Sequence, residues 1–418
     1  MLLSGRLKAG LPSDTWYEQG IHPRAKLVLS TTQSGEAPIE LSEEPGSRRP
    51  PQSVPQIKSL SPEGHLLRAR LSEKEQSPVA ILKERIDSKT ADTESIRLCL
   101  EDYYARVSRL PRIGRRKVIR SDAIGGLTLQ WLWQEDSRWA TTVQQDILLF
   151  NRLVHFLVAE ECEHFVLGWL RSDLPQDARP LFTKDTQNRW RGALLRALVL
   201  AHLVLDETAT ADPAIKVLNS VAQEVLALRT AKRKAGKEMD DEFAATSLWP
   251  AKVMLAKSLY TGRFWNTDSR LYDQFIGFVA VEKKKKDMSF TVAKLRLHHP
   301  TTPDPEPMWS LLQRDLRGPT QQRMLEQSVG SGTAARVQLL MTLDDLEQVL
   351  QSQDRFLDVD WVKATHARLL ADSDATSQKL YDFHLTSSEA RAKQTKGKRS
   401  SATGVRTSDR PLIRTYKV

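Results

Sequence analysis

The feature that most constrains this chain is a long succession of amphipathic helical patterns in its middle. Between Thr93 and Asp372, apolar residues recur every three or four positions, in segments that short polar loops separate. Alternating patterns that would indicate strands are few. Short loops favour antiparallel neighbours, and the chain is long for a single bundle. The sequence therefore predicts an all-α fold in which helical hairpins are stacked as an α-solenoid.

Composition divides the chain into three parts. Residues 1–92 are predicted to be a disordered N-terminal segment, because residues 30–80 are rich in Ser, Pro, Glu and Gly and poor in apolar residues. Residues 93–372 form the predicted helical-repeat body. Residues 373–418 are predicted to be a basic, largely disordered tail, since Ala390 to Val418 hold nine Lys or Arg against one acidic residue, Asp409. Such a tail suits an acidic partner.

Both ends of the chain carry signals for a cellular location. The first twelve residues combine leucines with Arg6 and Lys8 and contain no acidic residue, which is typical of a mitochondrial presequence; an ordinary disordered start is the alternative. Residues 393–399 also fit a nuclear import signal, so a nuclear location stays open.

Cys99 and Cys162 are too few for a disulfide framework and indicate a reducing compartment. No apolar run is long enough to predict a transmembrane segment.

Some expectations concern single helix boundaries. A helix is expected from Ser121 to Trp133, weakened by a glycine pair in its middle. The polar stretch from Arg229 to Asp241 is expected to separate two helices. Thr342, followed by Asp345 three residues later, is typical of a helix start and predicts that a new helix begins there.

Two helical segments begin almost alike. One reads Phe-Asn-Arg-Leu-Val-His-Phe-Leu from Phe150, and the other reads Tyr-Asp-Gln-Phe-Ile-Gly-Phe-Val from Tyr272. The first resembles a pentatricopeptide repeat, in which an aromatic residue precedes an asparagine, here Asn151. That family continues with a second helix that carries a Leu-Phe pair, matched by Trp169-Leu170, and then a proline, matched by Pro175.

This resemblance implies an organellar helical-repeat protein that binds single-stranded RNA, one base per repeat. It favours a factor of mitochondrial gene expression that contacts RNA or the mitoribosome. In that family the residue after the asparagine reads the base and is typically small and polar. Arg152 and Gln274 stand there in this chain, which puts base reading in doubt. The departure leaves room for binding to the RNA backbone, or for a scaffold that binds protein.

Three basic clusters lie in the predicted body, at residues 112–120, 229–237 and 283–286. Cations along one surface are what RNA phosphates require. The candidate RNA-binding residues are Arg112, Arg115, Arg116, Lys117, Arg120, Lys232, Arg233 and Lys234. If RNA follows one groove, the first two clusters should share a continuous face. Each cluster alone also fits a solvated helix face.

Four tryptophans could stack on bases, although tryptophan at helical spacing is also a common core residue. They are Trp131, Trp133, Trp139 and Trp265.

Catalytic signatures are missing from the sequence. Glu161 and His164 make one Glu-x-x-His unit, whereas a di-iron bundle needs two. His298 and His299 are expected in a loop, where a metal pair is the less favoured interpretation. No phosphate-binding loop or nucleophile elbow is present. We therefore predict a non-enzymatic protein without a cofactor or metal. The alternative to RNA contact is a protein-binding scaffold or assembly factor for an organellar or nuclear complex.

Overall fold

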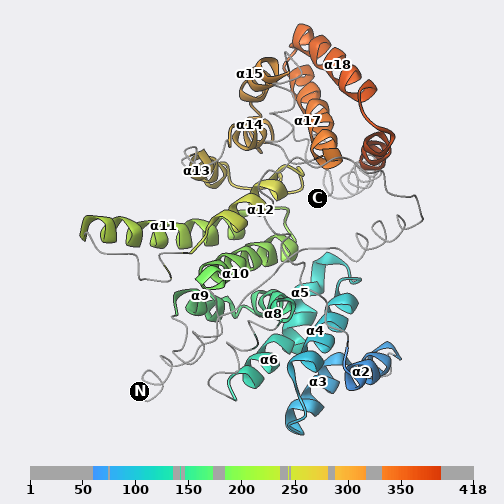
Figure 1. Cartoon of the computed structure of the whole chain (residues 1–418), viewed down its shortest axis with the longest axis vertical. Coiled ribbons are helices and arrows are strands. Elements are labelled where there is room, and N and C mark those ends of the chain that lie inside the picture. Colours follow the sequence, from blue (N-terminus) through green and yellow to red (C-terminus); the bar gives the residue numbers. More distant parts are fainter. Residues whose placement is uncertain are drawn as a thin grey trace, which may run out of the picture. The chain divides into compact units, whose positions relative to one another are not determined.

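The computed structural model describes residues 60–73, 76–134, 142, 146–172, 184–235, 243, 246–280, 288–316 and 332–386. Within these ranges the regular elements are helices and none is a strand (Figure 1), so the predicted all-α class is confirmed. No described helix is both long and apolar enough to cross a membrane.

The described helices fall into two compact units, and the division lies within helix α9, Glu163–Arg171. The helices of unit 1 are α2 (Pro62–Ser72), α3 (Pro78–Asp87), α4 (Thr93–Val107), α5 (Arg112–Asp122), α6 (Ile124–Leu132) and α8 (Ile147–Ala159). The helices of unit 2 are α10 (Lys184–Leu205), α11 (Asp212–Ala235), α12 (Trp249–Leu259), α13 (Ser269–Ala280), α14 (Ser289–Leu297), α15 (Glu306–Asp315), α17 (Gly332–Ser352) and α18 (Phe356–Ala371).

Helices α4 and α8 form the centre of unit 1. Helices α2, α3, α5 and α8 pack on α4, while α5 and α6 also pack on α8. The rings of Tyr103 in α4 and Phe156 in α8 meet edge to face, with their centroids 5.4 Å apart. Both side chains are buried. This arrangement around one pair of helices is that of a small bundle.

Unit 2 packs in chain order. Helix α10 contacts α11 and α12, α11 contacts α12 and α13, and α12 contacts α14. Helix α14 then contacts α13, α15 and α17, and α17 contacts α18 (Figure 1). A solenoid gives contacts of this kind, and so does an irregular bundle. The predicted stacking of hairpins as a solenoid therefore stays a prediction.

Order begins earlier than the sequence predicts. Helices α2 and α3 lie inside the segment 1–92, so the prediction of disorder is wrong for these two stretches. The proline content was the misleading signal. Pro62 and Pro78 each occupy the first turn of a helix, where a missing N–H costs nothing, and Ser61 and Ser77 cap the two helices.

The predicted tail also begins with structure. Residues 375–386 are helical. Their first turn is capped by Asp374, whose Oδ1 accepts a hydrogen bond from the Ser377 backbone N–H at 2.7 Å. Tyr381 is buried and its hydroxyl donates to Asp344 Oδ2 at 2.7 Å. The prediction of disorder is therefore wrong at this start of the tail, and the basic residues from Ala390 onwards lie outside the described residues.

Three helix boundaries differ from those expected. Helix α17 runs unbroken through Thr342 and Asp345, so the predicted helix start there is wrong. Helix α11 extends to Ala235, seven residues into the polar stretch from Arg229 to Asp241 that was expected to separate two helices. The expected helix from Ser121 to Trp133 is divided at Ala123, whose φ of 49° is left-handed. Helix α6 then starts at Ile124, and the glycine pair lies in its first turn.

The two similar segments become helices α8 and α13, with equivalent apolar positions buried in each. Phe150 corresponds to Tyr272, and Leu153 corresponds to Phe275; all four are buried. Helix α9 follows α8, as the predicted hairpin requires. These features agree with the pentatricopeptide-like interpretation and with many other amphipathic hairpins, so that relationship stays a prediction.

Candidate functional site

The first basic cluster lies on helix α5, and two of its arginines hydrogen-bond to backbone within unit 1. The guanidinium of Arg115 donates to the carbonyl oxygens of Ser108 and Leu110, both at 2.8 Å. Arg116 donates to the carbonyl oxygens of Val158 at 3.2 Å and Ala159 at 3.4 Å. These carbonyls end helices α4 and α8 or follow them, where backbone acceptors lack helical partners. The two arginines therefore stabilise the fold of unit 1.

The remaining cations of α5 differ in their surroundings. Arg120 pairs with Glu161 at 2.6 Å on the surface. Arg112 is half-buried, and Lys117 is exposed. Of the five residues predicted to bind RNA here, Lys117 alone is both exposed and without an ion pair among the described residues. Acceptors supplied from elsewhere in the chain could not be foreseen from the charge pattern.

The second basic cluster lies in the last turn of α11. The buried face of this helix ends at Val225, and no residue from 226 to 234 is buried. This end of α11 therefore extends beyond the core of unit 2 by about nine residues, or roughly 14 Å of helix. Lys232 is half-buried, whereas Arg233 and Lys234 are exposed. Arg229 fastens the start of this stretch, since its guanidinium donates to the Thr246 carbonyl at 2.8 Å.

The two clusters lie in different compact units. The α5 cluster belongs to unit 1 and the α11 cluster to unit 2, so their common face stays a prediction. The third cluster, residues 283–286, lies outside the described residues.

The tryptophans offer little to an RNA base near these cations. Trp131 is buried and donates from Nε1 to the Ala91 carbonyl at 3.3 Å. Trp133 stacks edge to face with Phe165 in unit 1. Trp265 is exposed, but the next residue, Asn266, bonds to the turn that precedes α11. Trp265 is therefore close to the opposite end of α11 from its basic turn. Trp139 lies outside the described residues.

A buried polar cluster links helices α14 and α17 of unit 2. Lys294 donates from Nζ to Thr342 Oγ1 at 2.8 Å, and Thr342 donates to the Gln338 carbonyl at 2.7 Å. His298 Nε2 and Asp345 Oδ2 lie 3.1 Å apart, and both side chains are fully buried. Burial lowers the pKa of Lys294, and the nearby Asp345 carboxylate partly offsets this effect.

The cluster is incompletely satisfied. His298 Nδ1 and Asp345 Oδ1 are buried and have no hydrogen-bond partner among the described residues. Nearby lies the ring of Tyr260, whose centroid is 5.3 Å from Lys294 Nζ. Buried titratable groups are a signal of functional sites, but structural networks have the same signature. The sequence contained one usable sign, which is that Asp345 falls on the buried stripe of a continuous helical pattern.

The residue after His298 in the chain, His299, lines a cavity of about 360 Å³. His299 Nδ1 accepts hydrogen bonds from the backbone N–H groups of Thr301 at 3.3 Å and Thr302 at 3.1 Å. The neutral ring therefore carries its proton on Nε2, which faces Asp273 Oδ1 at 3.5 Å. Burial lowers the pKa of His299, while Asp273 raises it.

This arrangement resembles a base held by a carboxylate, and Thr302 Oγ1 lies 3.0 Å from His299 Nδ1. A local turn accounts for that contact, because the threonine follows the histidine by three positions and its backbone N–H bonds the same atom. The Asp273 side chain is mostly exposed. The geometry supplies no donor pair for an oxyanion among the contacts described, and such a pair is a large term in acyl transfer. The cavity is best explained as a polar hollow where α13, α14 and the 300–305 loop meet.

The remaining chemical candidates are also accounted for locally. Glu160 Oε1 and Oε2 accept hydrogen bonds from the backbone N–H groups of Gly125 at 2.7 Å and Gly126 at 2.9 Å, so this carboxylate caps helix α6. Among the described residues no group of His, Cys, Asp and Glu could hold a metal ion.

Comparison with protein-family models, curated proteins and solved structures finds no match.

Proposed function

We propose that this chain is a non-enzymatic helical binding protein of mitochondrial gene expression, which contacts RNA or the mitoribosome through the end of α11. The observation that carries this proposal is a basic helix end that extends past the core of its unit. Arg233 and Lys234 are exposed there, and the fold of unit 2 does not bury them. Cations at a helix C-terminus also favour the helix macrodipole, but that effect needs no extension beyond the core.

The expected contact is with phosphates rather than with bases. Arg152, at the position of a base reader, lies over the Tyr104 ring, 3.8 Å from its centroid. Trp265 is exposed, but it lies near the opposite end of α11 from its basic turn. Phosphate contacts give affinity and position but carry no sequence information. We therefore propose binding that tolerates many RNA sequences.

Crosslinking tests this proposal at the level of the peptide. The full chain is bound to 4-thiouridine-labelled single-stranded RNA and irradiated, and the crosslinked peptides are identified. We expect crosslinks at residues 226–235 and few at 112–120, because Arg115 and Arg116 are engaged with backbone carbonyls. Crosslinks confined to the α5 segment, or none in the described residues, would contradict the role of α11.

The mitochondrial location is part of the same proposal and rests on the composition of residues 1–12, which lie outside the described residues. Replacing Arg6 and Lys8 by glutamate removes both positive charges of this stretch. If it is a presequence, the protein should then no longer enter mitochondria. Unchanged import, or nuclear accumulation of the unaltered chain, would contradict the location.

A protein-binding scaffold is the second candidate, and one observation favours it. Phe356 and Leu357 begin helix α18 and are 62% and 87% exposed. Adjacent large apolar residues at such exposure are a common sign of a protein contact. Replacing both by serine should abolish partner binding under this candidate. Under RNA binding by α11, the same variant should bind RNA normally.

A further inference from the structure

The local structures around Ser61 and Ser77 are alike. Each is exposed, each caps a helix, and each is followed by a proline in the first helical turn. Their backbones are extended, with φ and ψ of −63° and 159° at Ser61 and of −71° and 136° at Ser77. An extended serine before a proline, on an exposed turn, is the substrate chosen by protein kinases that require proline after the target residue.

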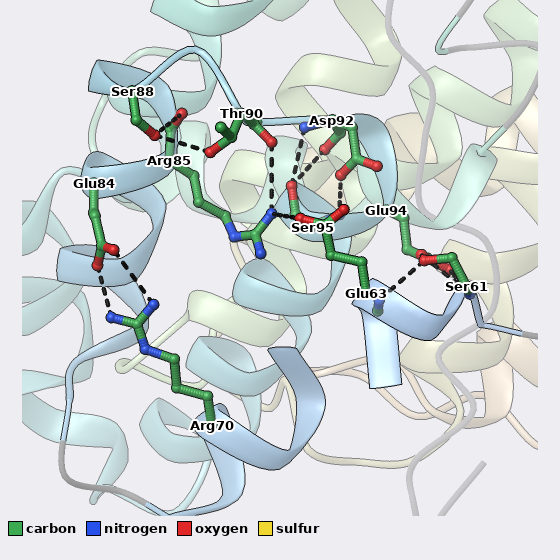
Figure 2. Close-up of polar contacts among 12 residues, drawn as sticks. Ser61, Glu63, Arg70, Glu84, Arg85, Ser88, Thr90, Asp92, Glu94 and Ser95 are labelled. Atoms are coloured by element: carbon green, nitrogen blue, oxygen red, sulfur yellow. Dashed lines mark hydrogen bonds and ion pairs between the residues drawn. The ribbon is translucent and has the colours of Figure 1, made fainter. Parts of the chain in front are cut away.

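The two serines differ in one contact. The Ser61 hydroxyl donates a hydrogen bond to the carboxylate of Glu94 in helix α4, and the Ser61 backbone N–H lies 3.3 Å from each oxygen of that carboxylate. Figure 2 shows the two side chains pointing toward one another. Among the described residues, the Ser77 side chain bonds only to the Val79 N–H of its own helix, at 3.3 Å.

Glu94 fits closely against the first turn of α2. A Cβ atom placed on Gly64 would lie 2.5 Å from Glu94 Oε2, so the absence of a side chain at this position admits the carboxylate. Gly64 N–H also donates to Ser61 Oγ at 2.9 Å. The positive end of α2 is thus already occupied by one negative charge, and the space around it is filled.

We propose that Ser61 is a phosphorylation site and that its modification releases α2 from α4. A kinase selective for Ser-Pro would transfer the γ-phosphoryl group of a nucleoside triphosphate to Ser61 Oγ. A P–O bond forms to Oγ and the bond to the nucleoside diphosphate breaks. The hydroxyl proton passes to the catalytic base of the kinase.

Phosphorylation would reverse the contact between Ser61 and Glu94. The phosphoester has no hydroxyl proton to donate and adds about −1.5 to −2 charges beside the carboxylate. Glu63 adds a further acidic group in the same turn. The nearby cation Arg85 is engaged with Glu63 at 3.2 Å and points its guanidinium toward the Thr90 carbonyl (Figure 2).

The other contacts of α2 are modest. Arg70 of α2 pairs with Glu84 of α3 at 2.7 Å, and Glu63 pairs with Arg85 at 3.2 Å; both are partly exposed ion pairs, which stabilise little. Leu67 and Leu71 are its buried leucines, and Arg106 of α4 donates to the Leu71 carbonyl at 2.9 Å. A short helix with two buried leucines is poorly stable without its packing. Repulsion at one end should therefore free the whole helix and expose the face of α4 that it covers.

Hydrogen exchange of the full chain, with phosphoserine placed at position 61, tests the proposal. We expect the α2 amides to exchange about tenfold faster or more, as for a locally opened helix. Phosphoserine at position 77 is the matched control. At that position a phosphate meets a free helix N-terminus, so exchange of the α3 amides should be unchanged or slower.

A substitution of Glu94 separates charge repulsion from simple loss of the cap. In Glu94→Gln, phosphoserine at position 61 should no longer accelerate exchange in α2. Ser61→Ala should accelerate it less than phosphoserine does, because it adds no charge. Slower exchange in phosphorylated α2, which would indicate pairing of the phosphate with Arg85, would overturn the proposal. So would failure of a Ser-Pro-selective kinase to modify Ser61 in the full chain.

Discussion

At the scale of single residues, position rather than charge decides what an ionisable group does in this chain. Glu160 caps α6 through two backbone N–H groups, but it is half-buried. Burial raises its pKa to about 7 from an ordinary 4.5, against the lowering effect of the two hydrogen bonds. Because the pKa of Glu160 is higher in the folded chain than in the unfolded chain, the unfolded chain loses this proton at a lower pH. Its stabilising contribution is therefore present below pH 4.5 and is lost as the pH rises through 7.

This predicts a specific dependence of stability on pH. Between pH 4.5 and 7.5, Glu160 should remove about 1–3 kcal/mol from the free energy of unfolding of unit 1. In Glu160→Gln this loss of unfolding free energy with rising pH should vanish, because the amide does not titrate. Urea unfolding at a series of pH values measures the difference between the two proteins. Equal slopes would show that Glu160 titrates normally.

Neighbouring cations on α5 make a second residue-scale prediction. Arg116→Ala removes the guanidinium donor from the Ala159 carbonyl and one of the donors to the Val158 carbonyl, which also accepts from the Glu161 N–H. It should cost about 1–2 kcal/mol of stability. Lys117→Ala removes an exposed side chain and should change stability by less than about 0.5 kcal/mol. Denaturant titration of both variants makes the comparison. If Arg116→Ala has the same free energy of unfolding as the unaltered protein, the Arg116 hydrogen bonds do not stabilise the packing of α5 on α8.

At the scale of elements, buried polar pairs fix how α14 and α17 meet. Asp345→Ala would leave the buried His298 without its partner and should cost about 3–5 kcal/mol. Asp360→Ala, at an exposed position of α18, is the control and should have little effect. Thermal unfolding followed by circular dichroism measures both. A loss below about 1 kcal/mol for Asp345→Ala would mean that the pair is not buried.

Helices were predictable where apolar spacing alone determines them. Ile96 and Leu100 stand four positions apart in the sequence, and both are buried in α4. Local sequence signals gave wrong predictions where one residue type can take two structural roles. Proline can break a helix or start one, so α2 and α3 were missed, and Asp345 can cap a helix or pair inside a core. The carbonyl acceptors of Arg116 come from α8, far along the chain, and no local pattern reveals them.

At the scale of the whole molecule, the charge of +10 does not by itself identify an RNA-binding surface. Part of it is engaged in holding unit 1 together, and the exposed end of α11 is one described part that the fold does not require. The central claim is that Arg233 and Lys234 contact RNA phosphates. Each such contact with a single strand contributes about −0.7 to the slope of log affinity against log salt concentration.

The most direct measurement is that slope for the full chain and for two variants with the same net charge. Arg233→Gln with Lys234→Gln should flatten the slope by about 1.4 and weaken binding to all RNA sequences alike. Lys216→Gln with Lys257→Gln, at exposed positions of α11 and α12, should leave both unchanged. Equal slopes in all three proteins would contradict the claim that the end of α11 binds RNA.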